Sequence, residues 1–337
     1  MTPSTNFEYF AGYSPGRSER LISLLIPVSG DPAIVAPSFE VERVRRNSMI
    51  KDVRGWEEQE NPFDLVRTTV ARWTRRGSAA VEPSTEYLTA LRLGQALQGW
   101  RLVDGSPVTE HLRIIKSPEE VALIRQAIVI TEDAIAATFA KLAVGMTERD
   151  VAQTLSGEMR QRGSQGGGLV QFGPSSALPH GGPAARPLER ETVVLIDAGC
   201  RVGGYTSDIT RTIWFGDSPS EEFKKVFNLV HDAQTAAMEL GNARRVACQE
   251  LDRAARRVIT DGGYGPYFTH RLGHGMGMDG HEHPYLVEGN TLRMEPGNVF
   301  TIEPGIYQLE KFGVRIEDDC LVTEGGLEVM SRRPAKV

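Results

Sequence analysis

Two pairs of carboxylates are the residues of this chain best suited to carry out chemistry. Asp197 follows the apolar run 193–196 and Asp208 lies beyond a glycine-containing turn, so this stretch predicts a β-hairpin. A turn centred between Val202 and Gly203 puts the two aspartates directly opposite each other. Directly opposed residues have Cβ atoms about 4.5–5.5 Å apart, and like charges in such positions destabilise a sheet. The pair therefore needs compensating positive charge.

A second pair of acids follows the same plan. Glu303 ends the apolar run 299–302, and the chain returns through residues 314–316 to Glu317. A loop centred on Glu310 puts Glu303 opposite Glu317. A metal cluster is the simplest source of charge for two such pairs, because a nearby cation favours the ionised form of a carboxylate.

The strongest local string, residues 273–284, lies between the two pairs in the sequence. Gly275, Gly277 and Gly280 have G-x-G-x-x-G spacing, but no apolar strand precedes them and no helix is predicted after them. This context argues against a dinucleotide site. We expect the glycines instead to let the backbone approach the acid cluster closely.

His274, within this string, adds one imidazole to the four carboxylates. The resulting ligand set is hard and rich in oxygen, which suits Mn²⁺, Co²⁺ or Fe²⁺, with Zn²⁺ as a further candidate. Four carboxylates exceed the need of one ion, whereas two ions about 3.5–4 Å apart can share bridging groups. We therefore expect two divalent metal ions per chain, with manganese or cobalt as the leading candidates.

The elements expected to position these groups repeat along the chain. Ser117 opens a capping box for a long helix to about residue 143, and Thr147 opens a second helix to about 163, followed by a loop at 163–168. In the second half we expect Ser218 to cap a helix at about 219–240, and a further helix at about 246–260.

Two offsets support an internal duplication. Ser218 follows Ser117 by 101 residues, and His281 follows His180 by the same distance, each histidine in an H-x-x-P motif. Helix, helix, histidine loop and carboxylate hairpin therefore occur twice. A pseudo-twofold arrangement of the halves would bring both hairpins to one central site.

Residues 1–112 have a different pattern, with short strands at 21–27 and 33–36 and helices at 64–76 and 85–97. We expect a small N-terminal α/β domain over 1–112 and an α+β catalytic domain over 113–337.

The composition excludes several classes of protein. With 337 residues, 40% hydrophobic content and a net charge of −6, the chain resembles a soluble globular protein and gives no reason to expect nucleic acid or a membrane as partner. The N-terminus lacks the pattern of a signal peptide. The cysteines, Cys200, Cys248 and Cys320, are odd in number and widely spaced, which suits a cytoplasmic protein and small apolar packing roles.

The motifs around the acids resemble those of the pita-bread metallopeptidases, and within them the Xaa-Pro peptidase branch of prolidase and aminopeptidase P. The resemblance covers nearly the whole chain and rests on these strings: Asp197-Ala-Gly, Gly-Tyr-Thr-Ser-Asp208-Ile-Thr-Arg-Thr, Gly-His274-Gly-x-Gly-x-x-x-His281-Glu-x-Pro, Glu303-Pro-Gly-Ile-Tyr, Gly-Val-Arg315-Ile-Glu317-Asp, Gly173-Pro-Ser-Ser-Ala-Leu-Pro-His180-Gly and Asn6-Phe-x-Tyr9-x-x-Gly-Tyr13.

The resemblance implies a division of the metal ligands. Asp197 and Asp208 would bind one ion, with Asp208 bridging; His274 and Glu303 would bind the other, and Glu317 would bridge. A bridging hydroxide would attack the scissile carbonyl of an Xaa-Pro bond in a dipeptide or short peptide.

The resemblance also implies catalytic roles for further side chains. Glu303 would shuttle a proton, His281 would stabilise the tetrahedral intermediate, and His180 would contact the substrate near the scissile amide. Arg315 would orient Glu317 or hold a substrate carboxylate. By contrast, we expect Glu310, Asp318 and Asp319 to be solvated charges and His270 and His283 to have packing or supporting roles.

The same resemblance implies a homodimer whose N-terminal, creatinase-N-like domain helps to wall the active site. Members usually have a further strand and helix before the segment at Asn6, so we expect either an incomplete N-terminal sheet or a misassigned start site. Two other functions stay open. One is a metallohydrolase of the same fold acting on another amide or amino-acid derivative, as ectoine hydrolase does; the other is a non-catalytic peptide-binding relative.

Overall fold

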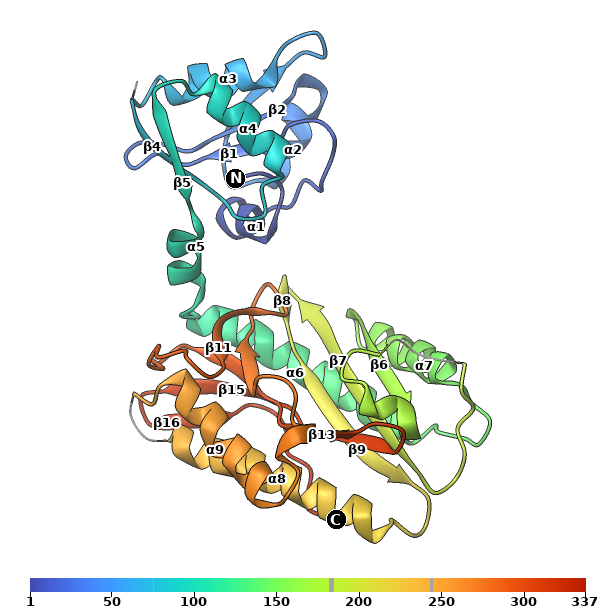
Figure 1. Cartoon of the computed structure of the whole chain (residues 1–337). Helices are drawn as coiled ribbons and strands as arrows, with labels where there is room; N and C mark the ends of the chain where they lie inside the picture. The colour runs from blue at the N-terminus through green and yellow to red at the C-terminus, as the bar shows by residue number, and fades with distance from the viewer. Residues whose placement is uncertain (75, 182–184, 243–244) are drawn as a thin grey trace. The chain divides into compact units, whose positions relative to one another are not determined.

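The computed structural model describes residues 1–337 apart from 75, 182–184 and 243–244. The chain divides into two compact units, Met1–Leu112 and Arg113–Val337 (Figure 1). Both units mix helices with strands, as the sequence predicted. Among the described residues, none of the helices has the length and apolar character needed to cross a lipid bilayer.

The N-terminal unit contains short strands and helices. Strands β1 and β2 pair antiparallel, β2 and β3 pair parallel, and β4 and β5 form a separate parallel pair. The strands are β1 (Ser23–Leu25), β2 (Ala33–Pro37), β3 (Asp52–Trp56), β4 (Gly77–Val81) and β5 (Trp100–Asp104). The helices are α1 (Thr5–Ala11), α2 (Val41–Asn47), α3 (Pro62–Val70), α4 (Tyr87–Ala96) and α5 (Ser106–Arg113).

The elements predicted for this unit are present, with bounds that differ by a few residues. Helix α3 begins before the predicted residue 64, because the Asn61 side chain caps it by accepting a hydrogen bond from the Phe63 N–H at 3.2 Å, and Pro62 occupies the first turn. The core of the unit includes Phe7 of α1 and Leu24 of β1, both buried.

The C-terminal unit contains two successive sets of helices and strands. The first set is α6 (Pro118–Phe139), α7 (Glu148–Gln161), β6 (Gln165–Phe172), β7 (Thr192–Val202), β8 (Tyr205–Thr206) and β9 (Ile209–Phe215). The second set is α8 (Glu221–Gly241), α9 (Cys248–Asp261), β10 (Gly273–Gly275), β11 (Glu282–Leu286), β12 (Val299–Ile302), β13 (Gly305–Gln308), β14 (Phe312–Arg315), β15 (Asp318–Thr323) and β16 (Gly326–Val329). The order of elements therefore repeats, as the duplication predicted.

The strands form two main sheets and a hairpin. Strand β7 lies between β6 on one side and β8 and β9 on the other, and the second sheet has the order β11-β10-β12-β15-β16. Strands β13 and β14 pair with each other. Figure 1 shows α8 and α9 side by side, and their buried faces contribute Phe223, Phe227 and Leu251 to a core shared with Phe300 of β12 and Ile306 of β13.

The helix caps confirm two predictions and correct one. Ser117 caps α6 in a capping box with Glu120, and Thr147 caps α7. Ser218 does not cap α8. Ser220 does, since its hydroxyl accepts a hydrogen bond from the Phe223 N–H at 3.1 Å. The N-cap of α8 therefore lies two residues after the predicted position.

The glycine-rich stretch 163–168 was predicted to be a loop, and most of it is strand β6. Its glycines allow β6 to lie against β7 at very short distance. A Cβ atom at Gly166 would be 2.5 Å from the Gly199 carbonyl oxygen, and one at Gly168 would be 2.2 Å from that of Asp197. A strand whose backbone must approach its neighbour closely tolerates glycine, which explains why composition misled the prediction.

Candidate metal centre

The first carboxylate pair lies on the hairpin of β7 with β8 and β9, but its register differs from the prediction. Asp197 pairs with Thr210 rather than with Asp208. The reason is the turn, in which Gly203 and Gly204 both have positive φ, at 55° and 91°, and form the two-residue connection. A shift of two residues keeps the same face of the strand. Asp208 therefore stays close to Asp197, in the break between β8 and β9.

The second pair has the predicted register. Ile302 pairs with Asp318, and Gly305 pairs with Arg315, so positions 303 and 317 lie between matched positions on both strands. The loop is centred on Glu310, which is exposed and has a φ of 65°. The expected opposition of Glu303 and Glu317 is confirmed.

His274 joins the carboxylates of both hairpins. Its Nε2 atom is 3.3 Å from Glu303 Oε1 and 3.8 Å from Asp208 Oδ2. One ligand atom each from Asp208, His274 and Glu317 lie within 4.8 Å of one another, a spacing suited to a metal ion. The Nδ1 atom is 3.1 Å from the Gly275 carbonyl oxygen, which places the ring proton on Nδ1 and leaves Nε2 free to bind a cation.

Burial makes it costly to keep the acids of this cluster ionised. It raises the pKa of Asp208 and of Glu317 well above their ordinary values, and the neighbouring acids raise them further. Burial also raises the pKa of Glu303 to about 7 and lowers that of His274 to about 3. Carboxylates with a neutral imidazole form the donor set that a hard divalent cation prefers, so these residues fit the predicted metals.

Arg315 connects the two hairpins, and it reaches Glu317 through the side chain of Thr210. Its Nη2 atom donates to Asp197 Oδ2 at 2.5 Å, and its Nε donates to Thr210 Oγ1 at 3.0 Å. The Thr210 hydroxyl in turn donates to Glu317 Oε2 at 2.6 Å. Thr210 of β9 therefore lies between Arg315 and Glu317, so the predicted orientation of Glu317 by Arg315 would act through the Thr210 hydroxyl.

A cavity of about 400 Å³ contains all the predicted site residues. Its lining comprises Pro179, His180, Asp197, Asp208, His270, Arg271, His274, His281, Glu303, Arg315 and Glu317. His180 and His281 are exposed, and the His281 ring stacks on His274 with 3.9 Å between centroids. Gly182 and Pro183 of the first H-x-x-P motif lie outside the described residues.

The glycines of the 273–284 string have separate roles. A Cβ atom at Gly275 would be 2.2 Å from the His283 carbonyl oxygen, and one at Gly277 would be 2.5 Å from Glu282 Oε1. Gly280 faces open space. At Gly275 the close approach is therefore to the backbone at His283 rather than to the acid cluster, and Gly277 makes room for a side chain.

The sequence reasoning missed Tyr307. Its hydroxyl lies 2.8 Å from His270 Nε2 and accepts a hydrogen bond from Arg315 Nη1 at 2.9 Å. The signal was available in the register: Gly305 pairs with Arg315, and Tyr307 is the next residue on the same face. Burial raises the pKa of Tyr307 to about 12, so the hydroxyl keeps its proton.

Asp318 and Asp319 were expected to be solvated and are fully buried instead. Asp319 Oδ2 accepts a hydrogen bond from the Asp208 N–H at 3.1 Å. Asp318 accepts hydrogen bonds from Arg211 at 2.7 Å, Gln234 at 2.8 Å and Ser331 at 2.6 Å. Both acids lie on β15, which is covered on each edge by a neighbouring strand, and this pairing was not visible in the sequence.

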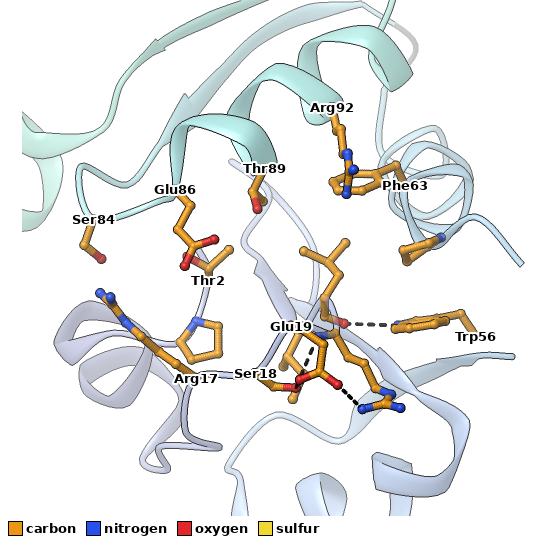
Figure 2. A pocket seen from close by; sticks show the side chains of 15 residues that line it. Thr2, Arg17, Ser18, Glu19, Trp56, Phe63, Ser84, Glu86, Thr89 and Arg92 are labelled. Atoms are coloured by element: carbon orange, nitrogen blue, oxygen red, sulfur yellow. Dashed lines mark hydrogen bonds and ion pairs between the residues drawn. The ribbon is translucent and has the colours of Figure 1, made fainter. Parts of the chain in front are cut away.

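A second cavity, of about 170 Å³, lies within the N-terminal unit (Figure 2). The described residues that line it include Arg17, Glu86 and the aromatic rings of Trp56 and Phe63, but neither histidine nor cysteine. Trp56 Nε1 donates to the Leu21 carbonyl oxygen at 3.0 Å beside it. This lining lacks a group of metal ligands, so the candidate chemistry belongs to the C-terminal unit.

Comparison with known proteins agrees with the geometry. The model of metallopeptidase family M24 matches residues 122–324, and that of the creatinase/prolidase N-terminal domain matches residues 1–115. An uncharacterized peptidase of Staphylococcus haemolyticus is 38% identical over 98% of this chain and 93% of its own length.

Solved structures also resemble the whole chain, and two serve as examples. A dipeptidase, PepE, of Mycobacterium ulcerans has a TM-score of 0.92 and 35% identity, covering 100% of this chain and 91% of that one. A prolidase of Thermococcus sibiricus has a TM-score of 0.91 and 33% identity, covering 100% of this chain and 92% of that one. The pita-bread fold with a creatinase-like N-terminal domain, expected from the motifs, is therefore confirmed.

Proposed function

The chain belongs to metallopeptidase family M24, and we propose that it hydrolyses the Xaa-Pro bond of dipeptides or short peptides with two divalent metal ions. The observation that carries this proposal is the convergence of buried carboxylates and His274 Nε2 on one cavity large enough for a small peptide. The prolidase and dipeptidase likenesses support the choice of substrate.

The proposed ligands divide between the hairpins. Asp197 and Asp208 would hold one ion, His274 and Glu303 the other, and Asp208 and Glu317 would bridge. When bound, the ions would activate water as the nucleophile and polarise the scissile carbonyl. Manganese and cobalt are the proposed metals because the donor set is mostly carboxylate oxygen.

Three side chains would then act on the substrate. Glu303, whose pKa lies near neutrality, would take the proton from the attacking water and pass it to the proline nitrogen. Partial burial of its ring and the charge of Arg271 lower the pKa of His281, so a neutral imidazole would donate an N–H to the oxygen of the tetrahedral intermediate. His180, exposed in the same cavity, would contact the substrate beside the scissile amide.

Chelation and metal replacement test the proposal. After dialysis against EDTA, we expect no hydrolysis of an Xaa-Pro dipeptide, and recovery of activity with Mn²⁺ or Co²⁺. Asp208→Ala should abolish activity, because it removes a bridging ligand. An Xaa-Ala dipeptide is the matched control substrate. A series of Xaa-Pro, Xaa-Pro-Yaa and longer peptides separates dipeptidase from aminopeptidase activity.

The outcomes separate the alternatives. Metal-replete protein that cleaves no Xaa-Pro substrate would overturn the proposal and leave another amide or amino-acid derivative as substrate. Protein that takes up almost no metal at saturation would indicate a non-catalytic relative. We also propose a homodimer, which light scattering after size-exclusion chromatography tests, and a cytoplasmic location, which suits the three free, buried cysteines.

A further inference from the structure

A buried group of charges lies beneath the loop that carries His281. Lys116 Nζ is 2.6 Å from Glu282 Oε1, and Arg113 forms an ion pair with Glu282 and another with Asp279 at 2.8 Å. Lys116 is only 5% exposed. Burial lowers the pKa of Lys116, while the charge of Glu282 opposes that change.

This group holds the loop from one side. The Lys116 N–H donates to the Gly297 carbonyl oxygen at 2.8 Å, and Asn298 Nδ2 donates to the Ile114 carbonyl oxygen at 3.0 Å. These contacts fix the segment 113–116 on the C-terminal unit. Glu282 is thus held by two cations whose own backbone segment is anchored.

The same carboxylate lies against the glycine string on its other side. A Cβ atom at Gly277 would be 2.5 Å from Glu282 Oε1 and 3.0 Å from Lys116 Cε, so glycine is needed for the pair to fit. The Gly277 carbonyl oxygen accepts hydrogen bonds from the N–H and the hydroxyl of Thr206, at 2.8 and 3.1 Å. Thr206 lies two residues before Asp208, so the group joins the His281 loop to the first hairpin.

We propose that Lys116 and Arg113, acting through Glu282, are positioning residues for His281. Glu282 follows His281 directly and begins β11, so fixing its carboxylate fixes where the preceding imidazole stacks on His274. This inference rests on the proposed function, in which His281 contacts the substrate. Because the pair touches no ligand atom of the cluster, it sets turnover and leaves metal binding unchanged.

The test compares Glu282→Gln, Lys116→Met and the double variant with Glu288→Gln, which breaks the exposed ion pair of Arg253. We expect kcat for an Xaa-Pro dipeptide to fall about 10- to 100-fold in the first three, with KM and metal content unchanged. The double variant should lose no more than Glu282→Gln, because the two side chains act as one unit. Glu288→Gln should match the wild type.

A second readout does not need activity. At one fixed pH, the imidazole ¹H–¹⁵N signals of His281 in protein loaded with diamagnetic Zn²⁺ should move in Glu282→Gln and stay in place in Glu288→Gln. If the wild type cleaves no Xaa-Pro substrate, the proposed function fails, whereas this measurement still decides the positioning role.

Two results would overturn the inference: wild-type kcat with unmoved His281 signals in folded Glu282→Gln, or a kcat loss that only follows lost metal. Should these variants fail to fold, Lys116→Arg and Glu282→Asp keep both charges. Each should retain metal and thermal stability yet lose kcat severalfold, and wild-type kcat in both would equally refute the role.

Discussion

At the scale of residues, Arg315 and Thr210 link the two acid pairs by hydrogen bonds. The guanidinium contacts Asp197 directly and reaches Glu317 through the Thr210 hydroxyl, so one cation orients a carboxylate on each hairpin. Thr210 is fully buried, and its hydroxyl both accepts and donates. Groups that orient ligands in this way tune metal affinity although they do not touch the metal.

Thr210→Val should weaken metal binding because it removes that relay while keeping the side chain's shape. Arg315 Nε loses an acceptor and Glu317 loses a donor, and we expect the Kd for Mn²⁺ to rise about 10- to 100-fold. Competition with a chelator measures it. The matched control is Thr154→Val. The Thr154 hydroxyl donates to the Asp150 carbonyl oxygen on α7 at 2.9 Å. Equal affinity in both variants would contradict the relay.

At the scale of elements, the close contact of β6 with β7 sets the position of the first hairpin. Gly168 pairs with Ala198, beside Asp197, and a Cβ atom there would overlap the Asp197 carbonyl oxygen and lie 2.8 Å from the Ala198 Cα. Both obstacles are backbone atoms of a central strand, which cannot move without moving the metal ligand. The glycine is therefore part of the site's support.

Gly168→Ala should destabilise the protein by about 1–3 kcal/mol, the cost of forcing extra volume into a packed region. Gly157→Ala is the control on the adjoining helix α7, where the nearest atom that the new Cβ would meet is 3.9 Å away. That change should stabilise the helix by about 0.5–1 kcal/mol, since alanine loses less backbone entropy. Urea unfolding measures both. A neutral Gly168→Ala would refute the steric argument.

The hairpins show what the sequence could and could not predict. Glu303 and Glu317 were aligned correctly because the loop is symmetric about Glu310. The Asp197 hairpin was misaligned by two residues because its turn is formed by two glycines with positive φ. Asp197 and Asp208 nevertheless line the same cavity, since a two-residue shift preserves the face of the strand.

Burial was harder to predict than residue type. Asp318 and Asp319 follow a metal-ligand motif and have the composition of a solvated turn, yet β15 is flanked on both edges by paired strands. Their hydrogen-bond partners Arg211, Gln234 and Ser331 are distant in sequence. Contacts of this kind depend on tertiary pairing and leave no local pattern.

At the scale of the whole molecule, each half of the C-terminal unit supplies one carboxylate pair, and the two pairs come together only when the halves are folded together. Asp197 and Asp208 come from the first set of elements, and Glu303 and Glu317 from the second. Burial raises the pKa of Glu303 from an ordinary 4.5 to about 7. The stability of the metal-free fold is therefore linked to proton binding at this cluster.

The sign of that linkage gives a testable pH dependence. Because the folded state holds the Glu303 proton more tightly than the unfolded state, its contribution is complete below pH 4.5 and is lost as the pH rises through about 7. We expect the unfolding free energy of metal-free wild type, relative to Glu303→Gln, to fall by on the order of 3 kcal/mol between these limits. Urea unfolding in EDTA at pH 4.5 and 8 measures the difference. Subtracting the unfolding free energy of the variant cancels the contributions of His270 and His274, which both proteins contain. With saturating Mn²⁺ the dependence should reverse, since the cation binds the ionised carboxylate. Parallel pH profiles for the two metal-free proteins would show that folding does not raise the pKa of Glu303.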